Sequence, residues 1–111
     1  MYKQSNILTS FFISGFQYHD GALVIDKLKP GKKLALKAEP DNPYDPCAVA
    51  IYRKDVQLGY IPKDENALVS QLLAFGHEKV VECRVMQVNP TADPWNQVRV
   101  GLYITDATKK K

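Results

Sequence analysis

The chain has 111 residues, of which 45% are hydrophobic and 24% charged, and its formal net charge is +3. This length excludes two independent hydrophobic cores, and this composition excludes a largely disordered chain. The excess charge comes from Lys109, Lys110 and Lys111, since the remaining residues hold 15 − 3 = 12 basic and 12 acidic side chains. Attraction for an acidic partner must therefore come from local clusters of lysine.

Short apolar runs separated by turn residues predict a chain made mostly of β-strands. In the first part of the chain, the runs at 9–16, 22–28 and 34–39 are expected strands, separated by turn residues at 18–21 and 29–32. The run at 34–39 alternates apolar and outward positions, which is typical of a half-buried strand.

The middle of the chain contains an expected hairpin and then an expected helix. Residues 47–53 and 56–62 form the hairpin, with a tight connection between them. Asp64 is the expected N-cap of the helix, and Gly76 stands where a C′ glycine belongs. Three apolar residues recur at i, i+4 and i+7 and are expected to face the core: Leu68, Leu72 and Phe75.

A second long hairpin is expected at the end of the chain. Residues 80–88 and 98–105 alternate cleanly and flank the loop at 89–97, which contains two prolines. About seven strands and one or two short helices in a chain of this length predict a mostly β fold, a small antiparallel β-barrel or half-barrel.

The N-terminal residues and the cysteines indicate the cellular compartment in which the protein is expected. The first residues, MYKQSNILTSFFISGF, lack the apolar core and cleavage site of a signal peptide, and no run approaches the ~20 apolar residues that span a bilayer. Cys47 and Cys83 are the only cysteines. We expect a cytoplasmic protein whose two thiols are reduced and mostly buried.

Motifs for catalysis or metal binding are missing from the sequence. It holds no phosphate-binding glycine loop, no H-E-x-x-H and no paired C-x-x-C. Cys47, Cys83, His19 and His77 lack the short chelating steps of a zinc site, and Cys47 begins a β-branched strand where a thiol usually fills space. We expect a binding module, with no cofactor, no metal and no enzyme activity.

Lysines and tyrosines are the residues that suggest a ligand. Five lysines lie within eleven residues: Lys27, Lys29, Lys32, Lys33 and Lys37. They fit either an edge strand that discourages sheet-to-sheet pairing or a stripe that contacts phosphates. Tyr18, Tyr44 and Tyr60 each lie at an expected turn or strand end, where a ring serves either as packing or as a platform for stacking.

The segment EPDNPYDPCAVAIY at 39–52 places three prolines, Pro40, Pro43 and Pro46, around Tyr44 and Asp45. Prolines restrict the loop before binding, so less ordering entropy is lost when a ligand engages. The alternative is that the polar residues only form the turn. A turn does not require a tyrosine, so the pattern favours a binding loop.

Four segments in this order strongly resemble the HIRAN domain. They are GFQY at 15–18, L-x-P-G-x-x-L-x-L at 28–36, E-P-x-N-P-Y-D-P-x-A-V-A-I at 39–51 and LGYIPK at 58–63. This domain occurs in certain SWI2/SNF2-type DNA-remodelling helicases and as a stand-alone bacterial or phage protein. The resemblance covers 9–105, which leaves 1–8 as an N-terminal extension and 106–111 as a basic tail.

The resemblance implies a small β-barrel related to the OB-fold that binds DNA, and in particular the 3′-hydroxyl end of a single strand. Tyr18 and Tyr44 would flank or stack on the terminal nucleotide, Asp45 would accept a hydrogen bond from the 3′-hydroxyl, and Lys63 would contact a phosphate. Asn42 would support the pocket. Further expected contacts are Tyr60, Gln17, Lys32 and Lys33.

At two positions the chain differs from the members that bind DNA ends. Gln17 stands where those members carry an arginine, and Tyr60 stands in place of a histidine. The expected function is recognition of single-stranded DNA in DNA repair or at replication forks, with a helicase or nuclease as a possible partner. The alternatives are a domain that binds a peptide or protein, and an accessory domain of a nuclease or other hydrolase.

Overall fold

The structure is a computed structural model, and it describes residues 5–105. The predicted basic tail at 106–111 and the first four residues of the predicted N-terminal extension lie outside the described residues. Within the described range, no helix has the length and apolar character needed to cross a membrane.

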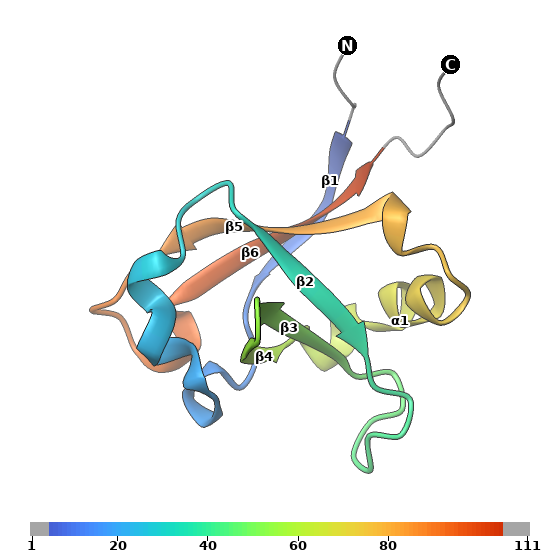
Figure 1. The fold of residues 1–111 in the computed structure, drawn as a ribbon, viewed down its shortest axis with the longest axis horizontal. Coiled ribbons are helices and arrows are strands. Elements are labelled where there is room, and N and C mark those ends of the chain that lie inside the picture. Colours follow the sequence, from blue (N-terminus) through green and yellow to red (C-terminus); the bar gives the residue numbers. More distant parts are fainter. Residues whose placement is uncertain (1–4, 106–111) are drawn as a thin grey trace.

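Six antiparallel strands form the sheet, in the order β1-β6-β5-β2-β3-β4 (Figure 1). The strands are β1 (Ser5–Phe12), β2 (Lys33–Ala38), β3 (Val49–Arg53), β4 (Val56–Tyr60), β5 (Val81–Val88) and β6 (Val98–Thr105). The start of β2 pairs with β5 through Lys33 and Leu34, and the rest of β2 pairs with β3. Strand β2 therefore joins the two halves of the sheet.

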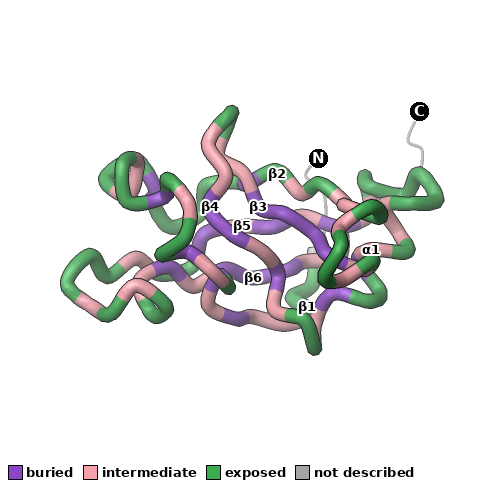
Figure 2. The backbone as a smooth tube through the Cα atoms, turned by 90° about the horizontal axis from the view of Figure 1, so that it is seen from below, coloured by how far each residue is buried: buried purple, intermediate pink, exposed green. Residues whose placement is uncertain are grey.

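One α-helix and five 3₁₀ segments connect the strands in the described chain. They are η1 (Phe16–Tyr18), η2 (Asp20–Lys27), η3 (Lys63–Glu65), α1 (Ala67–Ala74), η4 (Glu78–Val80) and η5 (Pro94–Asn96). The core collects buried side chains from every strand, from α1 and from the chain between β1 and β2. Figure 2 shows the buried backbone concentrated along the strands.

Five of the expected strands are confirmed within a few residues at their ends: 34–39, 47–53, 56–62, 80–88 and 98–105. The first strand lies earlier than expected, since β1 begins at Ser5 and ends at Phe12. It therefore includes residues that the sequence assigned to the N-terminal extension.

The strand predicted at 22–28 is wrong, because this segment belongs to the 3₁₀ segment η2. Its inward positions follow a spacing of three to four, from Gly21 to the half-buried Val24 and Ile25 and then to the buried Leu28. Gly21 lies so close to the ring of Phe16 that there is no room for a Cβ atom. Packing on Phe16 thus overrides the β-branched composition of the segment.

The expected barrel is not confirmed, because the sheet is not closed by a continuous ladder. A single antiparallel bridge joins Ser14, just after β1, to Tyr60 at the end of β4. Each of the two backbone N–H groups donates to the other residue's carbonyl oxygen at 2.9 Å. The mostly β, antiparallel character of the prediction is confirmed, with six strands in place of seven.

The bridge requires a glycine at position 59. Gly59 has a φ of +152°, and a Cβ atom there would collide with the carbonyl oxygen of Ser14 and the side chain of Ile13. Only glycine adopts this conformation readily and lets the two backbones approach so closely.

The predicted helix exists, but its buried face was predicted incorrectly. Val69 is 3% exposed and Leu73 packs against the core, whereas Leu68 is 61% and Phe75 79% exposed. The helix also begins after Asn66, not after Asp64, which lies in η3. Apolar residues occupy most positions from 67 to 75, so two stripes compete and periodicity cannot choose between them.

The predicted role of Gly76 is confirmed by the geometry at the end of α1. Gly76 has a φ of +85°. Its N–H donates to the Leu73 carbonyl at 3.2 Å, and the His77 N–H donates to the Leu72 carbonyl at 2.8 Å. This pair of bonds is the Schellman motif, which satisfies carbonyl groups that the helix leaves without partners.

Both cysteines are free thiols. Cys83 is buried in the core, and burial raises its pKa to about 12. This thiol therefore acts as a small apolar side chain. Cys47 is half-buried and lies at the end of the loop between β2 and β3.

Gly59→Ala should lower the free energy of unfolding by about 2 kcal/mol or more, from backbone strain and from collision with Ser14. Gly31→Ala is the matched control, since Gly31 also has a positive φ, +91°, but faces open space. Denaturant unfolding of both variants measures the difference. Equal losses of unfolding free energy in the two variants would show that the close approach of Gly59 to Ser14 does not contribute to the effect.

Val69→Ala should destabilise the fold by about 2 kcal/mol, because it leaves a space in the core. Leu68→Ala, at the neighbouring exposed position, should change the free energy of unfolding by less than about 0.5 kcal/mol. Thermal or denaturant unfolding compares the two. A larger loss from the Leu68 variant would mean that the helix is rotated relative to this description.

Candidate functional site

The loop at 39–48, between β2 and β3, is held by its own polar groups. The Oδ1 atom of Asn42 accepts the N–H groups of Tyr44 at 2.8 Å and Asp45 at 3.1 Å. The Oδ1 atom of Asp45 accepts the N–H of Cys47 at 2.9 Å. At the base, the Glu39 N–H donates to the Ala48 carbonyl at 2.9 Å. The loop is therefore fixed by hydrogen bonds as well as by its prolines.

A cleft of about 420 Å³ lies beside this loop. Three segments line it: the loop itself, the end of β4 with the residues after it, and the chain just after β1. The lining residues are Ser14, Asn42, Pro43, Tyr44, Asp45, Ala48, Tyr60, Ile61, Lys63 and Asn66. The Ser14–Tyr60 bridge brings these segments together, so the near-closure of the sheet forms one wall of the cleft.

Asp45 presents an ionised carboxylate to the cleft. Its Oδ2 atom accepts a hydrogen bond from Nδ2 of Asn66 at 2.9 Å. The hydrogen bonds from Asn66 and from the Cys47 N–H, with the positive charge of Lys63, hold the pKa of Asp45 below its ordinary value. Each carboxylate oxygen still has a free lone pair, so Asp45 can accept a further hydrogen bond from a ligand.

Tyr60 is positioned by Glu39. The Tyr60 hydroxyl donates to Oε1 of Glu39 at 2.8 Å, and the same oxygen accepts Nδ2 of Asn42 at 3.1 Å. The Gln57 amide lowers the pKa of Tyr60, but burial and the Glu39 carboxylate raise it, and the net pKa is raised. The phenol thus stays protonated near neutral pH. The ring of His19 lies 5.7 Å from that of Tyr60, centroid to centroid.

Five of the predicted site residues line this one cleft: Asn42, Tyr44, Asp45, Tyr60 and Lys63. Tyr44 is 88% exposed, so its ring is available to a ligand. Tyr18 and Gln17 do not line the cleft, and both are exposed in η1. Tyr18 is followed directly by His19, whose ring lies beside that of Tyr60.

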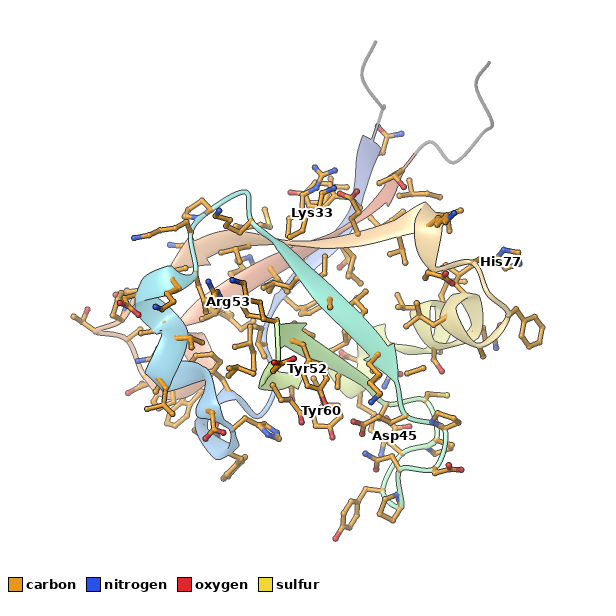
Figure 3. All side chains as sticks on the ribbon, in the orientation of Figure 1. Lys33, Asp45, Tyr52, Arg53, Tyr60 and His77 are labelled. Atoms are coloured by element: carbon orange, nitrogen blue, oxygen red, sulfur yellow. The ribbon has the colours of Figure 1, made fainter. Side chains whose placement is uncertain are left out.

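Lys32 precedes β2 and Lys33 begins it, whereas the loop at 39–48 follows its end. Figure 3 shows Lys33 and Asp45 toward opposite ends of β2. The Nζ atom of Lys33 pairs with Oε2 of Glu82 at 3.2 Å. Strand β2 lies between β5 and β3, so the interpretation of the lysines as protection of an edge strand is wrong.

Two residues of the site were not identified from the sequence. Asn66 is 2% exposed and donates to Asp45, and Glu39 accepts bonds from both Tyr60 and Asn42. Asn66 ends a short polar run before the helix, and such runs usually cap helices. Its burial in the structure shows a role other than helix capping, because a buried amide group requires a hydrogen-bond partner.

Within 5–105, no group of three or more histidine, cysteine, aspartate or glutamate side chains is arranged to hold a metal ion. The cleft instead combines one ionised carboxylate, one ammonium group and two tyrosine rings. These groups suit a ligand with hydroxyl, phosphate and flat aromatic parts.

Asn66→Ala should raise the pKa of Asp45 toward its ordinary value, because it removes the largest favourable contact of the ionised carboxylate. NMR titration of the carboxyl carbon measures this pKa in the folded protein. Asn96→Ala, at an exposed position in η5, is the control and should leave it unchanged. An unchanged Asp45 titration in the Asn66 variant would contradict the assignment.

The sign of the pH effect on stability follows from the same shift. The folded pKa of Asp45 is lowered, so its contribution to stability is complete above the unfolded pKa, about pH 4, and is lost as the pH falls through the folded value. The Asn66 variant, in which the pKa of Asp45 lies closer to its ordinary value, should have a smaller contribution from this group, so its stability should depend less on pH in the acid range.

Comparisons with known proteins agree on the fold. A protein from Lactobacillus plantarum has a crystal structure with a TM-score of 0.77 and 20% identity, covering 95% of this chain and 99% of its own. The crystal structure of the HIRAN domain of human HLTF gives a TM-score of 0.59 and 21% identity, covering 91% of this chain and 77% of its own.

No curated protein sequence matches the chain. The model of the HIRAN domain family matches residues 7–105, nearly the whole chain. The chain therefore belongs to the HIRAN domain family, a family of nucleic-acid-binding domains.

Proposed function

We propose that the cleft binds the 3′-hydroxyl end of single-stranded DNA, as would be needed in DNA repair or at replication forks. The observation that supports this proposal most directly is the carboxylate of Asp45. It is ionised, fixed by Asn66 and the Cys47 N–H, and placed in one cleft with Tyr44 and Lys63.

The charge of Asp45 favours a terminal hydroxyl over a terminal phosphate. A carboxylate accepts a hydrogen bond from a hydroxyl group and repels a phosphate group. The Glu39 carboxylate accepts the Tyr60 hydroxyl close by and adds a second negative charge on this side. An internal nucleotide, whose 3′ oxygen carries a phosphate, would meet the same repulsion.

Tyr44 and Lys63 would bind the rest of the terminal nucleotide. The exposed ring of Tyr44 offers a flat apolar surface on which any base can stack. Lys63, exposed at the start of η3, would contact the phosphate on the 5′ side and so fix the polarity of the strand. Tyr18, next to His19, would stack on a base outside the cleft.

The experiment compares three forms of one oligothymidylate: with a 3′-hydroxyl, with a 3′-phosphate and as a circle. Fluorescence anisotropy at fixed salt measures the dissociation constants. The wild type should bind the 3′-hydroxyl strand about 10- to 100-fold more tightly than the 3′-phosphate strand, the range expected for one charge-assisted hydrogen bond.

Asp45→Asn should remove this preference, since it removes the charge but keeps an acceptor for the Cys47 N–H. Asp41→Asn is the matched control: it removes the same charge from an exposed position in the same loop, and should leave the preference intact. Equal affinity of the wild type for all three forms would indicate a general single-strand binder. No affinity for any form would point to another partner, such as a peptide.

A further inference from the structure

A second hollow, of about 320 Å³, lies on the outer face of β2 and β3. We call it the β2–β3 groove, and its lining residues are Ala35, Lys37, Tyr52, Lys54 and Asp55. It contains one aromatic ring and two ammonium groups. None of these residues was assigned to the cleft.

The strand register places this groove and the cleft on the same face of the sheet. Ala35 pairs with Tyr52, and Lys37 pairs with Ala50, which also pairs with Tyr60 of the cleft. Side chains of directly paired residues lie on the same face. Tyr52 and the Ala50–Tyr60 pair are therefore two positions apart along β3, roughly 7 Å.

The two sites are separated on this face by a small residue, Ala50. Ala50 is 0% exposed, pairs directly with Tyr60 and lies two positions before Tyr52 on β3. Figure 3 shows Tyr52 and Tyr60 as neighbours over β3 and β4, as the register requires. A strand that leaves the cleft along this face would meet the ring of Tyr52 next.

Lys54 occupies an unfavourable backbone conformation at the mouth of the groove. Its φ of 54° is the only positive φ of a non-glycine residue between residues 5 and 105. Glycine, asparagine or aspartate adopts this conformation at lower cost. Lys54 is therefore not a residue that this backbone conformation favours, and it places an ammonium group in the lining of the groove.

We propose that the β2–β3 groove binds the nucleotides on the 5′ side of the terminal two. Tyr52 stacks on a base, and Lys37 and Lys54 contact phosphates. This inference rests on the proposed function of the cleft. Asp55 leaves the lining with a net charge of 2 − 1 = +1, which suits a short contact with one or two phosphates.

The test uses oligothymidylates of two to ten nucleotides, all with a 3′-hydroxyl end. NMR titration measures the weak short ligands, and anisotropy measures the longer ones. Wild-type affinity should rise as the first few nucleotides are added on the 5′ side. Tyr52→Leu should weaken the longer ligands about 5- to 100-fold, as expected for one lost base stack, and leave the dinucleotide unaffected.

Lys54→Gly tests the charge without weakening the fold, since glycine relieves the strain at this turn. It should reduce the slope of log K against log salt by about 0.7 for the longer ligands only, and Lys37→Gln should do the same. Lys79→Gln, at an exposed lysine of η4 outside the groove, is the control and should leave the slope unchanged.

Two failures are distinguishable. If the wild type does not bind the dinucleotide at all, both the cleft proposal and this inference are overturned. If the dinucleotide binds, but the gain with length is the same in the Tyr52, Lys37 and Lys54 variants, the groove assignment alone is wrong and the cleft proposal stands.

Discussion

The two hydrogen bonds between Ser14 and Tyr60 hold opposite ends of the sheet together, and the geometry of the cleft depends on them. Without this bridge, the chain after β1 would not reach β4, and Tyr60 would have only one neighbouring strand. The bridge exists because residue 59 is a glycine. Because Gly59 has no side chain, the chain after β1 can approach the end of β4 at the other edge of the open sheet, and a concave site forms there.

The cleft is arranged before any ligand arrives. Asn42, Glu39 and Asn66 use their polar groups on other protein atoms, and these bonds fix Asp45 and Tyr60 in place. A site of this kind loses little conformational entropy on binding. Tyr44, at the exposed tip of the same loop, is the exception, since its ring has no such restraint from the hydrogen bonds of the loop.

Much of the fold could be predicted from the sequence, because β-strand alternation and turn residues are local signals. The loop at 39–48 could be predicted for the same reason, since its prolines and Asn42 act within a few residues of one another. The errors occurred where a contact distant in the chain decides the structure. Packing of Gly21 on Phe16 turns a β-branched run into η2, and the core selects Val69 from two apolar stripes of α1.

The same distinction applies to the site. Asp45, Tyr44 and Asn42 are close in the sequence and lie together in the cleft. Asn66 joins them only because the fold brings the chain after η3 next to the loop, and no local pattern indicates that its amide is buried. Tyr18 lies outside the cleft lining because the position of η1 depends on how the turn after β1 packs.

The strand order has a consequence for self-association. Strand β1 is at one edge of the sheet, and its sequence, SNILTSFF, contains no charged residue and no proline. Ile7 and Leu8 are exposed there, and no lysine on this strand discourages pairing with another chain. At high protein concentration, β1 is therefore an edge along which a second copy would extend the sheet.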